Sequence, residues 1–176
     1  MLVPQTGIRN TSTMIEIIPN WHPIFVHFTV ALFTVSVILY TVIFWASYSR
    51  WNTSLFVVEC DIVARWCLWL AALSTITTVS AGFYAFYTVE HGAMAHAAKV
   101  IHRNWALATA SAILLMAFWA VWRYIKSQKP TVTFLMALFL VQVLLLTTAW
   151  YGGELVYRYG YGVLLPAKAE KAVSPH

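Results

Sequence analysis

The chain has 176 residues, of which 61% are hydrophobic and only 10% are charged. A soluble domain carries about a quarter charged residues, so the composition excludes an ordinary soluble protein and indicates an integral membrane protein. The formal net charge is +5, and the basic residues form no dense run. This distribution argues against nucleic-acid binding and favours contact with lipid headgroups.

Four apolar spans follow one another along the chain, each near the roughly 20 residues that a helix needs to cross the hydrocarbon core. The predicted helices cover about residues 24–46, 62–87, 103–124 and 131–151. The first is preceded by Pro23, which is tolerated in a first helical turn. The predicted fold is therefore all-α, a four-transmembrane-helix bundle formed by one membrane domain over residues 1–176.

The remaining segments are assigned by composition. No apolar segment with a cleavage site precedes the first span, so no cleaved signal peptide is expected. Residues 152–165 begin with two glycines and are expected to form a C-terminal cap, and residues 166–176 a polar tail. No internal repeat is evident.

Four crossings place both termini and the second connection on one side of the membrane. The short basic segment RYIKSQK, residues 123–129, lies on the other side and is expected to be cytoplasmic. The sequence therefore predicts a multi-pass protein of the bacterial inner (cytoplasmic) membrane, with both termini and a histidine cluster on the periplasmic side.

Histidines gather at that predicted face. Five of the six histidines fall there: His22, His27, His91, His96 and His102. A single interfacial histidine can simply extend its polar edge into water. Five together favour a functional site, because ionisable groups at bilayer depth are costly.

The spacing of the histidines limits how they can act. His22 and His27 are five residues apart, about 140° around a helix, so they cannot bind one ion together. Each ligand is therefore expected to pair with a histidine of another segment, as in helix bundles that hold cofactors. His27 lies about 7 Å deeper than His22 by helical rise and is predicted to be the more buried ligand.

Haem b, in one or two copies, fits this pattern best, because imidazole is a common axial ligand. Arg103, Lys99 or Arg158 could meet the haem propionates. The chain has no CxxCH attachment motif, so the haem would be held without a thioether bond. Copper is the main alternative cofactor, since imidazole also suits copper.

Three motifs resemble those of one family. HPIFVHFTVAL at residues 22–32, HRNWALAT at 102–109 and GGELVYRYGYGV at 152–163 are similar to motifs of the domain-of-unknown-function 2231 family, small four-helix membrane proteins. The resemblance implies a histidine-ligated cofactor, haem, in an electron-transfer role. It applies to His22, His27 and His102, whereas His91 and His96 rest on the topology argument.

The leading hypothesis is a membrane-embedded b-type cytochrome subunit, an electron-transfer subunit of a larger respiratory complex rather than a stand-alone enzyme. Its expected partners are other membrane or outer-face redox proteins, quinone and the lipid bilayer. Two alternatives stay open: a histidine-based copper or zinc binding or transport protein, and a scaffold subunit without a cofactor.

Overall fold

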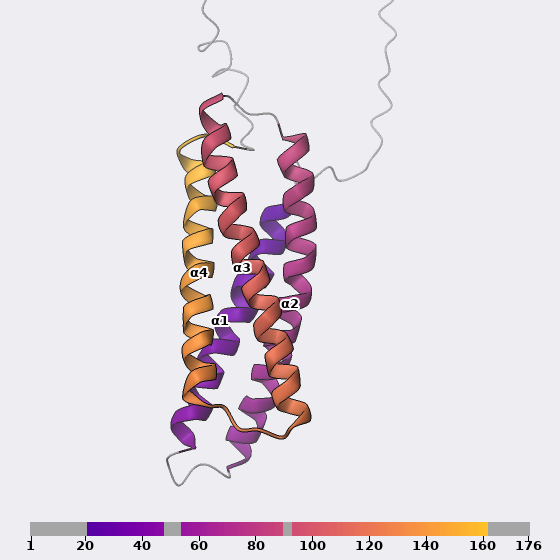
Figure 1. Cartoon of the computed structure of the whole chain (residues 1–176), viewed down its shortest axis with the longest axis vertical. Helices are drawn as coiled ribbons and strands as arrows, with labels where there is room; N and C mark the ends of the chain where they lie inside the picture. Colours follow the sequence, from indigo (N-terminus) through magenta and orange to yellow (C-terminus); the bar gives the residue numbers. More distant parts are fainter. Residues whose placement is uncertain (1–20, 48–53, 90–92, 162–176) are drawn as a thin grey trace, which may run out of the picture.

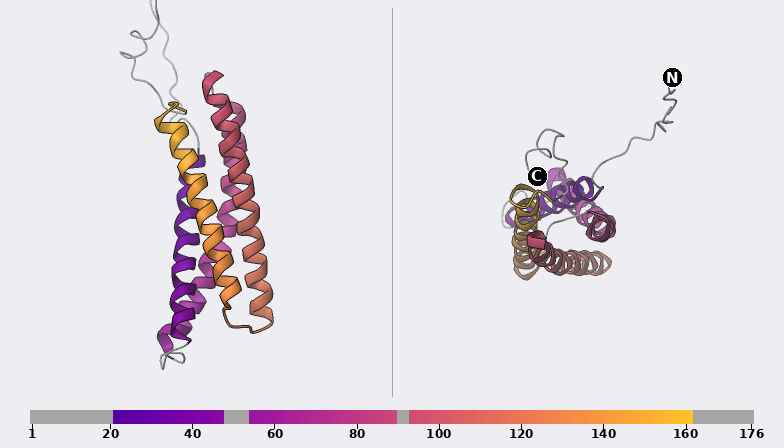
Figure 2. Two further views of the ribbon diagram at one scale, coloured as in Figure 1. Left: turned by 60° about the vertical axis from the view of Figure 1, so that its left-hand side comes forward. Right: turned by 90° about the horizontal axis from the view of Figure 1, so that it is seen from above.

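The structure is a computed structural model that describes residues 21–47, 54–89 and 93–161. These residues form four helices: α1 (His22–Ala46), α2 (Leu55–Thr88), α3 (Ala93–Ile125) and α4 (Val132–Tyr157). The helices lie side by side as one bundle and alternate in direction (Figures 1 and 2). The predicted all-helical, four-helix architecture is confirmed.

Three of the helices are long and apolar enough to cross a membrane. They are α1, the part of α3 from His96 to Ile125, and α4. α2 is not one of them, so the prediction of four membrane spans is confirmed only for three. Charged side chains (Glu59, Asp61 and Arg65) lie near the start of α2, and five serines and threonines lie between residues 74 and 80.

The helices pack in a ring in which each one contacts the next, and α4 closes the ring against α1. α1 and α3 therefore face each other across a diagonal of the bundle. The starts of α1 and α3 and the ends of α2 and α4 lie at the same end (Figure 1). Since it contains His22 and His102, we call this the histidine end.

α3 begins ten residues earlier than predicted. Residues 93–102 were expected to belong to a connection, but they are helical. Four of the first six residues of α3 are alanines, and alanine has the highest helix propensity. His96 and His102 therefore lie on α3 and not in a loop.

α4 also runs further than predicted. It continues through Gly152 and Gly153 to Tyr157, so the residues expected to start a cap are helical. Each glycine in a helix costs about 1 kcal/mol relative to alanine, and at Gly152 this cost coincides with the close approach of a side chain from α3. The turn after α4 is at Gly160, whose φ is +62°.

α1 and α2 are in contact through two small residues, Ser36 and Ala64. Ser36 and Ala64 are both fully buried, and the Ser36 hydroxyl donates a hydrogen bond of 2.9 Å to the Ala64 carbonyl. Small residues allow such close helix contacts in membrane bundles. This contact holds the two helices together below the histidine end.

Candidate histidine site

His22 and His102 converge at the histidine end of the bundle. Their ring centroids are 6.3 Å apart and their ring planes lie at 79°. Both side chains are half-buried. His22 is the first residue of α1 and His102 lies nine residues into α3, so the two diagonal helices each supply one imidazole.

The orientation of the His22 ring is set by α2. Nδ1 of His22 lies 2.9 Å from the carbonyl oxygen of Thr78. A carbonyl only accepts hydrogen bonds, so Nδ1 carries the proton and Nε2 carries the lone pair that a metal requires. One turn further along α2, Gly82 lies beside the ring: a methyl group there would come within 3.0 Å of Nδ1 and Cε1 of His22.

The His102 ring is placed against α4 in the same manner. A methyl group on Gly152 would lie 3.1 Å from Cε1 of His102. The Thr148 carbonyl lies near the ring, but among the described residues no group meets hydrogen-bond geometry with the buried Nδ1 of His102. This nitrogen is a buried polar atom whose bonding is incomplete.

Two pairs of threonine hydroxyls lie beneath the two rings. Thr29 of α1 and Thr78 of α2 have their hydroxyl oxygens 3.0 Å apart, and those of Thr109 of α3 and Thr148 of α4 are 2.8 Å apart. Thr78 and Thr148 each also donate to a carbonyl four residues earlier in their own helix, at 2.7 and 2.9 Å. Because each hydroxyl has one proton, Thr78 accepts from Thr29. The Thr109 hydroxyl lies within hydrogen-bond distance of both the Thr148 hydroxyl and the Leu144 carbonyl, to which it donates at 3.3 Å.

The sequence model of one family, described as "Predicted membrane protein (DUF2231)", matches residues 19–164. The chain belongs to this family. The predicted resemblance is thus confirmed, and the match covers both histidines of the pair and the residues against which they pack. No curated protein and no solved structure matches the chain.

The other histidines of this DUF2231 protein lie away from the pair or outside the described part. His27 is exposed on α1, and its Nδ1 is bonded to the carbonyl of Pro23 in its own helix. The prediction that His27 is more buried than His22 was wrong, because the turn of the helix places it on the outer face. His96 is exposed on α3, and His91 falls outside the described residues.

Cationic side chains lie close to the pair at the same end. Lys99, one turn before His102, is only 5% exposed, and its ammonium group donates to the Phe86 carbonyl at 2.9 Å. The Arg103 guanidinium lies 5.2 Å from the centre of the Phe86 ring and donates to the side chain of Asn104. Arg158 forms an ion pair with Glu154, with an N–O distance of 2.7 Å.

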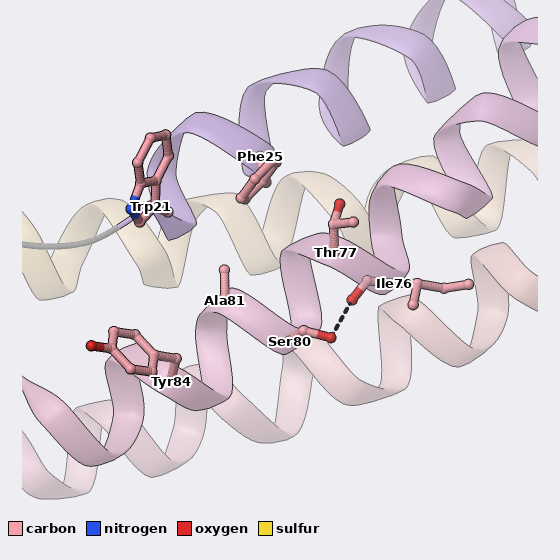
Figure 3. Close-up of a pocket in the computed structure, with 7 residues that line it drawn as sticks. All are labelled: Trp21, Phe25, Ile76, Thr77, Ser80, Ala81 and Tyr84. Carbon is pink, nitrogen blue, oxygen red and sulfur yellow. Dashed lines mark hydrogen bonds between the residues drawn. The ribbon is translucent and has the colours of Figure 1, made fainter. Parts of the chain in front are cut away.

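A groove of about 550 Å³ lies on the outer face between the start of α1 and α2. Figure 3 shows Trp21, just before α1, and Phe25 of α1 on one side of it and Ala81 and Tyr84 of α2 on the other. The Ser80 hydroxyl in its wall donates to a carbonyl of its own helix, so the groove presents a mainly apolar surface. It lies at the histidine end, since two of its lining residues, Trp21 and Ala81, directly precede His22 and Gly82 in the chain.

The residues that hold the pair in place were not identified from sequence. Gly82, Thr78 and Thr148 were not singled out, and Gly152 was expected only to form a turn. A signal was present: Thr-Thr-x-x-x-Gly occurs at residues 77–82 and again at 147–152. Each glycine lies on the helix next to the one that carries its histidine, so spacing along a single helix does not reveal the contact.

Proposed function

We propose that this DUF2231 protein binds haem b through His22 and His102 and transfers electrons as a membrane-embedded b-type cytochrome subunit. The observation that carries the proposal is the pair of imidazoles from diagonal helices, with centroids 6.3 Å apart. Supplied by opposite corners of the bundle, these two imidazoles would be the protein ligands that hold the haem.

The number of ligands also supports haem. A structural zinc site takes four protein ligands, whereas haem supplies four nitrogens itself and needs two from the protein. Within residues 21–47, 54–89 and 93–161, no group of three or more His, Cys, Asp or Glu side chains could hold a metal ion. The described site thus offers the donor set that bis-histidine haem ligation uses.

In this proposal the chain's own residues have separate roles. The Thr78 carbonyl fixes the tautomer of His22, and Gly82 and Gly152 let the rings lie against α2 and α4. Lys99 and Arg103 supply positive charge for the propionates. Bound haem would accept and release one electron, and the apolar bundle would limit access of water to it.

We also propose that all four helices cross a bacterial inner membrane with the histidine end on the periplasmic side. α2 packs along α1 (Figure 1), which supports its crossing as part of the bundle. The short connection at the other end carries Lys126 and Lys129, and basic residues favour the cytoplasmic side.

The test is the absorption spectrum of the purified full-length protein from haem-replete cells, oxidised and then reduced with dithionite. We expect a Soret band and an α band that sharpens on reduction, with one haem per chain. Preparations without either band contradict the proposal. Metal analysis of the same sample that finds copper or zinc in place of iron would support the metal-binding alternative.

A quinol in the α1–α2 groove is the electron donor that we propose, because the groove opens on the outer, apolar face beside His22. Replacing Ala81 with tryptophan places a large ring in the groove. We expect the Ala81→Trp variant to keep its haem spectrum and to lose most of its rate of haem reduction by a soluble quinol analogue, measured by stopped flow.

The matched control for this variant is Ala108→Trp, because Ala108 is exposed on α3 and outside the groove. It should be reduced at the wild-type rate. Equal reduction rates for wild type and Ala81→Trp would show that the groove holds lipid chains and does not serve a quinol.

A further inference from the structure

The two halves of the bundle carry the same residues at the same places. His22 and Thr29 of α1 correspond to His102 and Thr109 of α3, 80 positions later in each case. Thr78 and Gly82 of α2 correspond to Thr148 and Gly152 of α4, 70 positions later. Each half is a helical hairpin that contributes one histidine, two threonines and one glycine.

The contacts within the two sets are also the same. In each set, a glycine of the second helix lies against the imidazole. The threonine hydroxyl of the first helix lies within hydrogen-bond distance of the threonine hydroxyl of the second helix. The threonine of the second helix also donates to a carbonyl four residues earlier in its own helix. In each, the carbonyl of that second threonine lies at the ring. The sets differ in two contacts: only His22 makes a hydrogen bond to that carbonyl, and only the second set includes a hydrogen bond from the first-helix threonine, Thr109, to the carbonyl of Leu144.

Burial extends the correspondence along the helices. All six buried residues of α1 have buried counterparts 80 positions later in α3. Five of the six buried residues of α4 have buried counterparts 70 positions earlier in α2. The pairs are Thr29/Thr109, Phe33/Ile113, Ser36/Met116, Val37/Ala117, Tyr40/Ala120 and Ile43/Arg123, then Ala64/Phe134, Leu68/Leu138, Ala71/Val141, Thr75/Leu145 and Ala85/Leu155.

We infer that the bundle is an internal duplication of one helical hairpin, and that each hairpin holds one of the two ligands through its own threonine–glycine set. Thr29, Thr78 and Gly82 are positioning residues for His22. Thr109, Thr148 and Gly152 are the equivalent positioning residues for His102. The equivalence of the sets is independent of the cofactor, whereas their effect on haem affinity rests on the proposed function.

The test compares Gly82→Ala and Gly152→Ala with Gly153→Ala. The first two changes place a methyl group 3.0 or 3.1 Å from a histidine ring, whereas a methyl group on Gly153 meets only the Tyr157 ring, at 4.0 Å. In haem-free full-length protein labelled with ¹⁵N-histidine, each of the two variants should shift the ring resonances of its own histidine. Each should also weaken haem binding about tenfold, as loss of an outer contact to a ligand typically does, and Gly153→Ala should match wild type.

Two results would overturn the inference: ring resonances unmoved in both variants, or a perturbation at one histidine with no counterpart at the other. If the wild type bound no haem, the proposed function would fail, and the ¹⁵N resonances would still decide whether the two sets are equivalent. Thr78→Val and Thr148→Val provide a second comparison that keeps side-chain volume nearly constant. They should shift the resonances of His22 and His102, respectively, to a similar extent.

Discussion

Replacing either His22 or His102 with alanine is expected to abolish haem binding, because an iron centre that needs two axial imidazoles would retain one. The expected result for His27→Ala and His96→Ala is full haem content, since both side chains are exposed. The Soret absorbance per chain in purified protein measures the difference. His27 lies in the family motif, so this comparison separates the geometry of the site from sequence resemblance.

A conservative variant tests the same assignment without removing the ligand. Methionine also binds haem iron and raises its potential, so His102→Met should keep haem and show a higher reduction potential than wild type in a redox titration. Full haem content in both alanine variants would rule out the pair as the ligands. Loss of haem in His27→Ala with folding intact would move the site to the outer face of α1.

Replacing Ala64 with leucine is expected to destabilise the bundle strongly. Ala64 is 0% exposed, and its carbonyl accepts the hydrogen bond of the equally buried Ser36. A leucine has no space there, and such overpacking typically costs about 1–3 kcal/mol. The unfolding midpoint in detergent, followed by circular dichroism as SDS is added, should fall well below that of wild type.

The control for this change is Ala108→Leu, which adds the same side chain at an exposed position of α3. It should unfold at the wild-type midpoint. Equal midpoints for Ala64→Leu and Ala108→Leu would show that α1 and α2 do not depend on close contact at Ser36.

Much of the fold could be predicted from sequence, because apolar spans of membrane length have few alternatives. The ends of the helices could be predicted less well. A drop in hydropathy at residues 88–104 indicated a connection, yet the alanines there extend α3 beyond the apolar span. Likewise, Gly152 and Gly153 were expected to start a cap after the helix, whereas packing against His102 favours a glycine at position 152 inside α4.

The site could be predicted in part. Histidines at one end of the bundle could be recognised, and the spacing argument pairs histidines of different helices, as the structure does with His22 and His102. The spacing could not say which histidine faces inward: a depth argument favoured His27, but rotation about the helix axis decides burial. The internal repeat was missed because it consists of a few polar residues on an apolar background, and it becomes evident only when contacts between helices are known.

The diagonal placement of the two imidazoles has a consequence for stability. Within the described residues, α1 and α3 have no close backbone approach of their own, so a group bound by both histidines would join two helices on opposite corners of the bundle. A ligand that binds the folded state alone raises stability with its concentration. Such a cross-link between the two hairpins would oppose their separation. The fraction of chains with a group bound at the histidine pair should therefore determine how long the bundle stays folded in detergent.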